Sequence, residues 1–224
     1  MKKYIGMAWP SDGLNDSEYW SYVPPNYELL ITRYPVSGLF TKKNLINEGK
    51  IKFISKFIKN IKIDNLDSLI VCDFAGSVLN GINYINKMEN HFTKKLNIPT
   101  INIVNSTLNF INNHRKKISI ISPYSNSITK EFLKLIKNKN TIERVFNLSF
   151  KSEKEINSNI KIIEYNKFKD LKGDLFFIGG GVTIRYYKKI YQTKLKNKIY
   201  SSPMILVNDA VKIINSWVII IYQT

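Results

Sequence analysis

Short apolar runs alternate with amphipathic stretches along the chain. Runs of four to eight apolar residues are typical of buried strands, and apolar residues at helical spacing are typical of helices that pack on a sheet. The expected strands are residues 4–8, 28–32, 68–73, 100–103, 117–121, 143–148, 175–178 and 204–207. The expected helices are residues 44–60, 76–96 after a turn, 107–113, 127–137, 182–195 and 209–217. This alternation predicts an α/β fold with parallel sheets and helices on both faces.

The alternation starts again near Lys117, which predicts two similar α/β halves with a site in the cleft between them. We place the N-terminal half at residues 1–115 and the C-terminal half at residues 116–204. The remaining segment, 205–224, is a candidate to pack back onto the first half. In parallel α/β folds, ligands bind at the carboxyl ends of the strands, so residues just after each strand are the candidate site residues.

Four strand ends carry the candidate chemistry, at residues 6–12, 71–77, 120–126 and 176–183. The first backbone N–H groups of a helix have no partners within it, so turns of this kind favour anions. Two such turns that face each other would hold a small anionic carboxylate, with Ser77 and Tyr124 as hydroxyl donors. The predicted backbone contacts are Phe74, Ala75, Gly76, Gly180, Gly181, Val182 and Thr183.

Asp73 is the candidate acid or base, because it follows a buried strand and enclosure there would raise its pKa. The alternative is an aspartate that only stabilises the turn or caps the next helix. Asp12 and Glu18 are further acids for which surface roles are favoured. The three glycines at 179–181 allow close backbone approach to a ligand, but no Gly-Lys-Ser/Thr follows, which excludes a P-loop.

Composition narrows the function classes. The net charge is +17, yet the lysines are dispersed and no nucleic-acid-binding motif is present, which favours a solvated basic surface over nucleic-acid binding. The apolar runs are too short for a membrane span and the N-terminus does not resemble a signal peptide, so we expect a cytoplasmic protein. One cysteine and two distant histidines argue against a disulfide framework or a zinc site, and we expect no metal or cofactor.

The strand ends also resemble, in order, those of the aspartate/glutamate racemase superfamily, in its maleate-isomerase and arylmalonate-decarboxylase branch. The matching segments are Pro10-Ser11 with Glu18, Arg33, Asp73 to Ser77 with Gly81, Ser122-Pro123-Tyr124, Gly181 to Arg185, and Val207 to Ala210. The resemblance spans residues 6–210 and implies a racemase-like fold of two halves. It also implies substrate contacts at Ser11, Tyr124 and Asn208, and it leaves a homodimer open.

The chain departs from this family at the catalytic cysteines. The family uses one cysteine, or a pair, on either side of the reacting carbon, whereas here the first position holds Asp73 and the second falls within 179–181. Cys72 stands one residue early, and the alternation of side chains along a strand is expected to turn it away from the site.

Together with the resemblance, these residues lead us to expect a cofactor-independent lyase that decarboxylates a small carboxylate or dicarboxylate through an enediolate-type intermediate. Asp73 would transfer the proton, while Ser77, Tyr124 and backbone amides stabilise the developing charge. One acid opposite a glycine turn fits decarboxylation and reprotonation better than racemisation by two bases. An isomerase or racemase with non-cysteine bases, and a ligand-binding protein without catalysis, are the alternatives.

Overall fold

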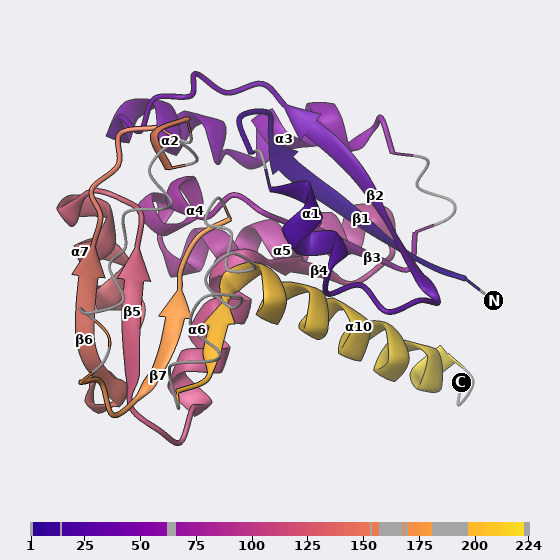
Figure 1. Ribbon diagram of the computed structural model, residues 1–224. Coiled ribbons are helices and arrows are strands. Elements are labelled where there is room, and N and C mark those ends of the chain that lie inside the picture. The colour runs from indigo at the N-terminus through magenta and orange to yellow at the C-terminus, as the bar shows by residue number, and fades with distance from the viewer. Residues whose placement is uncertain are drawn as a thin grey trace.

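The computed structural model describes residues 2–13, 15–61, 66–152, 154–156, 168, 170–180 and 197–221, with side chains as far as residue 216. Two four-stranded parallel sheets form the body, one from each half of the chain (Figure 1), which confirms the predicted α/β fold. The first sheet has the order β2-β1-β3-β4, with β1 (Lys3–Pro10), β2 (Tyr27–Tyr34), β3 (Ser68–Val71) and β4 (Thr100–Asn102). The second has the order β6-β5-β7-β8, with β5 (Ile118–Ser122), β6 (Ile142–Asn147), β7 (Asp174–Phe177) and β8 (Ile199–Ser201).

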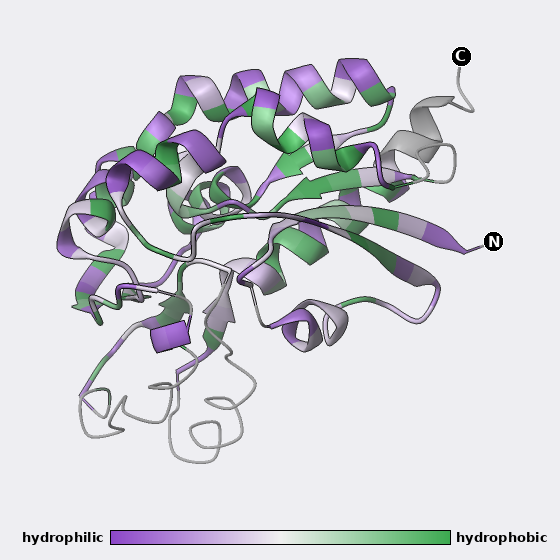
Figure 2. Cartoon of the chain, turned by 90° about the horizontal axis from the view of Figure 1, so that it is seen from above, coloured by the Kyte–Doolittle hydropathy of each residue, from purple (hydrophilic) through white to green (hydrophobic). Residues whose placement is uncertain are grey.

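The two sheets therefore repeat one topology, so that β1 corresponds to β5 and β3 corresponds to β7. The central strands are the most apolar elements (Figure 2), and every residue of β3 and of β5 is buried. One apolar cluster runs through both halves, including Ile5 and Phe74 of the first half and Ile120 and Phe176 of the second. Burial of this shared core fixes the two halves against each other, which positions the strand ends.

The described helices of the N-terminal half are α1 (Asp16–Trp20), α2 (Lys42–Glu48), α3 (Ile51–Ile58), α4 (Ala75–Asn80), α5 (Ile82–Leu96) and α6 (Ile103–Asn113). Those of the second half are α7 (Asn126–Leu135), a 3-10 turn (Lys139–Thr141) and α10 (Ser202–Ile221). Helix α10 follows β8 and packs against α6, α1 and β3. No described helix is both long enough and apolar enough to cross a membrane.

Two helices expected to be continuous are interrupted at glycines. The predicted helix 44–60 ends at the C-cap Gly49 and begins again after Lys50. The predicted helix 76–96 is divided at Gly81, whose φ of 85° a non-glycine residue adopts only at a cost. The first break matters for function, because it ends α2 beside the cavity described below.

The strand predicted at 204–207 was wrong. Strand β8 ends at Ser201, whose hydroxyl accepts a hydrogen bond from the Met204 amide at 3.2 Å, as an N-cap serine does. Pro203 then stands in the first turn, where proline is tolerated. The apolar run belongs to α10, since its buried positions continue at helical spacing through Ala210 and Ile214. The predicted helix 182–195 lies outside the described residues.

Candidate functional site

Residues that follow β1, β3, β5 and β7 surround a cavity of about 40 Å³. They include Asp12 after β1, Asp73 after β3, Tyr124 after β5 and Gly180 after β7. The loop 36–40 and helix α2 complete the described part of the lining. Because one ordered water needs roughly 10–15 Å³, this volume holds about three water molecules. The position agrees with ligand binding at the carboxyl ends of parallel strands.

The two halves place different chemistry at equivalent positions. Asp73 lies two residues after the end of β3, and Gly179 lies two residues after the end of β7, the corresponding strand. Asp12 and Tyr124 stand in the same relation to β1 and β5. The first half therefore supplies the carboxyl groups, and the second half supplies a phenol and a glycine turn.

Asp73 is a buried carboxyl group, with only 6% of the residue exposed. Its Oδ1 atom accepts a hydrogen bond from the Gly76 amide at 3.2 Å, whereas its buried Oδ2 atom has no hydrogen-bond partner among the residues that the structure describes. The pKa of Asp73 is raised to about 7, mainly by burial and in part by the charge of the nearby Glu48, while hydrogen bonds from Gly76 and Ser77 oppose the rise. A carboxyl group that is half-protonated near neutral pH can both give and take a proton.

Two glycines make room for the Asp73 carboxyl group. A Cβ atom on Gly49 would come within 3.0 Å of Oδ2, and a Cβ atom on Gly76 would come within 3.0 Å of both oxygens. The Gly76 position is closed on its other side by the Leu45 carbonyl. The end of α2 and the start of α4 are thus packed directly on the acid, which holds it in one orientation.

The ring of Tyr124 packs against two other aromatic rings, those of Phe74 and Phe40. Its ring lies parallel to that of Phe74, with centroids 5.5 Å apart and an interplanar angle of 8°, and 5.6 Å from the ring of Phe40. A Cβ atom on Gly179 would come within 3.0 Å of the Tyr124 hydroxyl, and Gly179 has a φ of 93°. Glycine at position 179 thus allows the backbone after β7 to lie against this phenol.

Cys72 also contributes to the lining, which the alternation of side chains along a strand did not predict. The reason is that β3 ends at Val71, so the alternation does not continue to the next residue. Burial raises the pKa of the Cys72 thiol well above its ordinary value, although a hydrogen bond with Tyr19 opposes this effect. The thiolate form is therefore strongly disfavoured.

Several predicted contacts do not reach the cavity. Ser11 is exposed and its hydroxyl accepts a hydrogen bond from the Val36 amide at 3.2 Å. Gly76 and Ser77 lie behind Asp73, where the Ser77 hydroxyl accepts a hydrogen bond from Asn102 at 2.9 Å. Asn208 lines a different cavity, between α6 and α10. Phe74, Ala75, Gly180 and Tyr124 do line the site, while Gly181, Val182, Thr183 and Arg185 lie outside the described residues.

Arg33, the other arginine that the resemblance brought forward, has partners within the fold. Its guanidinium pairs with Asp16, donates to the Gly13 carbonyl at 2.7 Å and to the Pro10 carbonyl at 3.2 Å, and lies over the ring of Trp9. It fixes the turn after β1 rather than facing a ligand in the cavity.

Glu48 and Phe40 are site residues that sequence reasoning missed. Both follow the carboxyl end of β2, so the same strand-end rule points to their segment, but Glu48 stands on a helix well beyond the strand. Its position depends on the break at Gly49. Among the residues that the structure describes, no three His, Cys, Asp or Glu side chains gather as a set of metal ligands.

Neither a protein-family model nor a curated protein sequence matches the chain. Solved structures do resemble it. The maleate isomerase of Pseudomonas putida gives a TM-score of 0.70 at 12% identity, over 96% of this chain and 94% of that chain. The maleate cis-trans isomerase of Nocardia farcinica, with a covalently bound succinylcysteine intermediate, gives 0.71 at 9% identity over 96% and 94%. Unliganded arylmalonate decarboxylase gives 0.66 at 12% identity over 95% and 93%. The chain therefore has the two-half α/β fold of the maleate isomerases and arylmalonate decarboxylases.

Proposed function

We propose that the chain is a cofactor-independent enzyme that transfers a proton to carbon in a small carboxylate, with decarboxylation as its first reaction class. The observation that carries the proposal is Asp73, a carboxyl group buried at the strand ends and lining the cavity, whose Oδ2 atom finds no hydrogen-bond partner in the described part of the chain. Its pKa of about 7 leaves it substantially protonated at neutral pH, so it can act as the acid.

The proposed reaction takes a substrate with two carboxylates on the reacting carbon and breaks the bond from that carbon to one of them, which leaves as carbon dioxide. The electron pair stays on the remaining carboxylate as an enediolate, and neutral Asp73 then gives its proton to the carbon. We assign the Tyr124 hydroxyl and the backbone amides of Ala75 and Gly180 to the developing negative charge. Asp73 regains its proton from solvent.

The two halves contribute different side chains to the cavity, and this difference supports a reaction in which a single acid delivers the proton. Among described residues, the second half contributes Tyr124 and Gly180 to the lining, neither of which is a carboxylic acid or a thiol. Racemisation by two bases needs such a group on each side of the carbon. A covalent thiol mechanism is disfavoured as well, because burial keeps Cys72 protonated.

The test begins with a thermal-stabilisation screen of the purified protein against malonates, maleate, other small dicarboxylates and amino acids. A ligand at a hundredfold excess over its Kd stabilises the fold by about 2.7 kcal/mol. Each ligand that binds is then incubated in deuterated solvent. Proton NMR follows the C–H signals of substrate and product, which show where deuterium has entered, and the release of carbon dioxide is measured separately.

Asp73→Asn should bind the ligand and lose turnover, while Asp170→Asn, which alters an exposed aspartate, should keep it. Deuterium incorporation without carbon dioxide release would favour an isomerase or racemase instead. Binding without any turnover would point to a ligand-binding protein that is not a catalyst, and no binding by any carboxylate would contradict the proposal.

A further inference from the structure

A second cavity lies between α7 and β6, the strand at one end of the second sheet (Figure 1). Its volume is about 410 Å³, and pockets that bind small ligands measure roughly 300–1,000 Å³. Four aliphatic side chains and three lysines line this groove, namely Lys130, Leu133, Lys134, Ile136, Lys139, Ile142 and Val145. The lining shares no residue with the described lining of the strand-end cavity, so the groove is a separate candidate site.

An irregularity in β6 brings two of the aliphatic side chains together. Ile142 pairs with Ile118 of β5, whereas Val145, three residues further along, pairs with Ile120, only two residues further along. Strand β6 therefore carries one extra residue, which shifts the alternation of the side chains that follow it. Because residues 118 and 120 face the same side of the sheet, Ile142 and Val145 also share a face. Plain alternation would have placed them on opposite faces.

Part of the aliphatic lining is in contact with solvent. Val145 is 38% exposed, and Leu133 and Ile142 are only partly buried against the core. Ile136 is buried and closes the floor of the groove. A hydrocarbon chain laid over these side chains would remove apolar surface from water, which is favourable in proportion to the area covered.

Lysines stand around the aliphatic lining. Lys130 and Lys134 are one helical turn apart on α7, and Lys139 stands in the 3-10 turn before β6; all three are exposed. Lys134 pairs with Glu131 at 2.8 Å, but an exposed pair of this kind is weak, so Lys134 can exchange that partner for a ligand carboxylate. The aliphatic stem of a lysine can also lie along apolar surface while its ammonium group stays in water.

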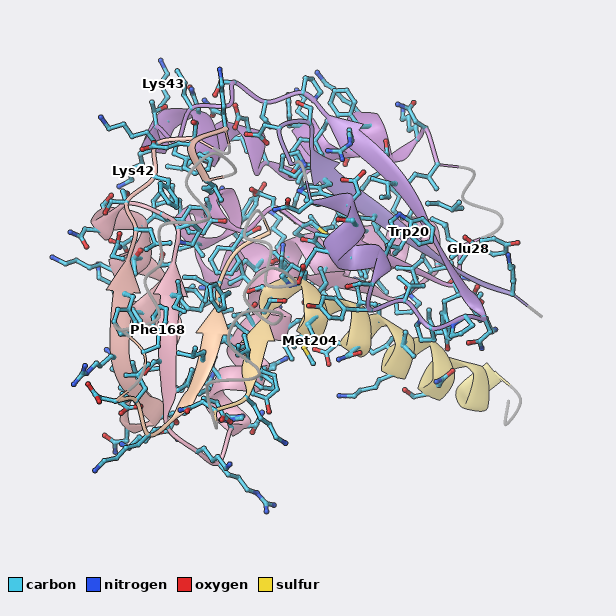
Figure 3. The ribbon with its side chains drawn as sticks, in the orientation of Figure 1. Trp20, Glu28, Lys42, Lys43, Phe168 and Met204 are labelled. Atoms are coloured by element: carbon cyan, nitrogen blue, oxygen red, sulfur yellow. The ribbon has the colours of Figure 1, made fainter. Side chains whose placement is uncertain are left out.

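The surrounding surface is basic as well. The pKa of Glu131 is lowered by its hydrogen bond with Lys134 and by the positive charges of Lys134 and Lys42. Lys42 stands with Lys43 at the start of α2, where both side chains project away from the body (Figure 3). The electrostatic field around the groove therefore favours an anion.

Size and charge decide between the possible occupants. A second copy of the chain, related by a two-fold axis, would set lysines against lysines. A stable protein partner contacts roughly 20–30 residues on each side, whereas seven line this groove. A flexible hydrocarbon chain with one anionic end matches both the aliphatic lining and the lysines around it.

We propose that this groove binds a medium-chain acyl carboxylate. The hydrocarbon chain lies over Leu133, Ile142 and Val145, and the carboxylate pairs with Lys130 and Lys134 of α7. The site is separate from the strand-end cavity, so the inference goes beyond the proposed function and does not depend on it.

Calorimetry on the full-length protein tests the proposal with decanoate, kept below its micelle concentration. Octanoate shortens the chain by two methylene groups, and decyltrimethylammonium keeps the chain but reverses the charge. Burying one methylene group tightens binding about fourfold, so decanoate should bind roughly tenfold more tightly than octanoate. The cationic compound should bind about tenfold or more weakly than decanoate.

Two variants test whether the ligand lies in the groove. Val145→Glu brings a carboxylate to an exposed position in the lining and should weaken decanoate binding about tenfold or more. Lys130→Gln combined with Lys134→Gln should weaken it to a similar extent. The matched control combines Lys94→Gln with Lys95→Gln, two exposed lysines in the last turn of α5. The control lowers the net charge equally and should keep the wild-type affinity. Circular dichroism checks that each variant is folded.

An affinity that does not change with chain length, or that falls equally in both lysine pairs, would overturn the inference, because either result shows a general attraction to a basic surface. It is also overturned if decanoate does not bind below its micelle concentration. In that case, sedimentation with vesicles of phosphatidylcholine and phosphatidylserine that is lost in Val145→Glu would identify the groove as a membrane contact instead. None of these outcomes involves Asp73, so the proposed function is tested separately.

Discussion

Asp73→Asn is expected to stabilise the fold by an amount that grows with pH. Burial raises the pKa of Asp73 to about 7 in the folded chain, whereas an aspartate in an unfolded chain titrates near ~3.9. Between these two values the folded state binds more protons than the unfolded state, so stability falls as pH rises. The penalty is absent below about pH 4 and complete above about pH 7. Asparagine does not ionise, so the variant escapes it.

The magnitude follows from the window of pH. From about pH 5 to about pH 7 the loss of stability from ionising Asp73 grows over two pH units. At 1.36 kcal/mol per unit this amounts to about 2.7 kcal/mol. Taking the difference between two pH values removes the constant cost of replacing a carboxyl oxygen by an amide nitrogen. The advantage of the variant should therefore be larger by about this amount at pH 8 than at pH 5.

The assay is urea unfolding followed by circular dichroism, with the free energy of unfolding of wild type and variant compared at about pH 5 and about pH 8. Asp170→Asn is the control, because it makes the same substitution at an exposed aspartate outside the cavity lining. A difference between variant and wild type that stays constant across this range would refute the assignment of a raised pKa to Asp73, and with it the proposed acid.

Three further substitutions test the packing around the site. Gly76→Ala should cost about 2–3 kcal/mol in urea unfolding, because its Cβ atom meets the Leu45 carbonyl and the acid; an unchanged midpoint would contradict this geometry. Gly179→Ala should cost about 1–3 kcal/mol from its positive φ and from contact with Tyr124, and a double-mutant cycle with Tyr124→Phe should recover part of that cost. Cys72→Ala should cost about 1 kcal/mol and keep kcat/KM within a few-fold, so a loss above a hundredfold in a folded variant would restore a thiol mechanism.

The fold was predictable because the buried strands read as apolar runs and the strand-end rule then points to the site. Asp73, Tyr124 and Gly180 were found in this way. The strand-end rule did not identify Glu48, because the position of its side chain depends on where α2 ends. The apolar spacing across residues 44–60 continues through Gly49 and gives no sign of that end. Gly76 and Ser77 were predicted to contact the ligand because the sequence does not show which of their groups already have partners within the fold. A pattern of residue types does not show that the Gly76 amide is already bonded to Asp73.

The apolar run 204–207 shows a second feature of the fold that the sequence pattern did not determine. Four apolar residues fit a strand and a helix equally well, and their tertiary setting decides between the two. Here the Ser201 cap and the buried positions at Ala210 and Ile214 place the run in α10.

The correspondence of Asp73 with Gly179 has a stereochemical consequence. If the proton comes from the first half alone, it reaches a planar intermediate from one face, and the product is a single enantiomer. Inverting the product would require an acid at the end of β7, where a side chain at Gly179 would need a strained backbone and would collide with the Tyr124 hydroxyl. On the proposed function, the close packing of Tyr124 against Gly179 would thus determine which enantiomer forms.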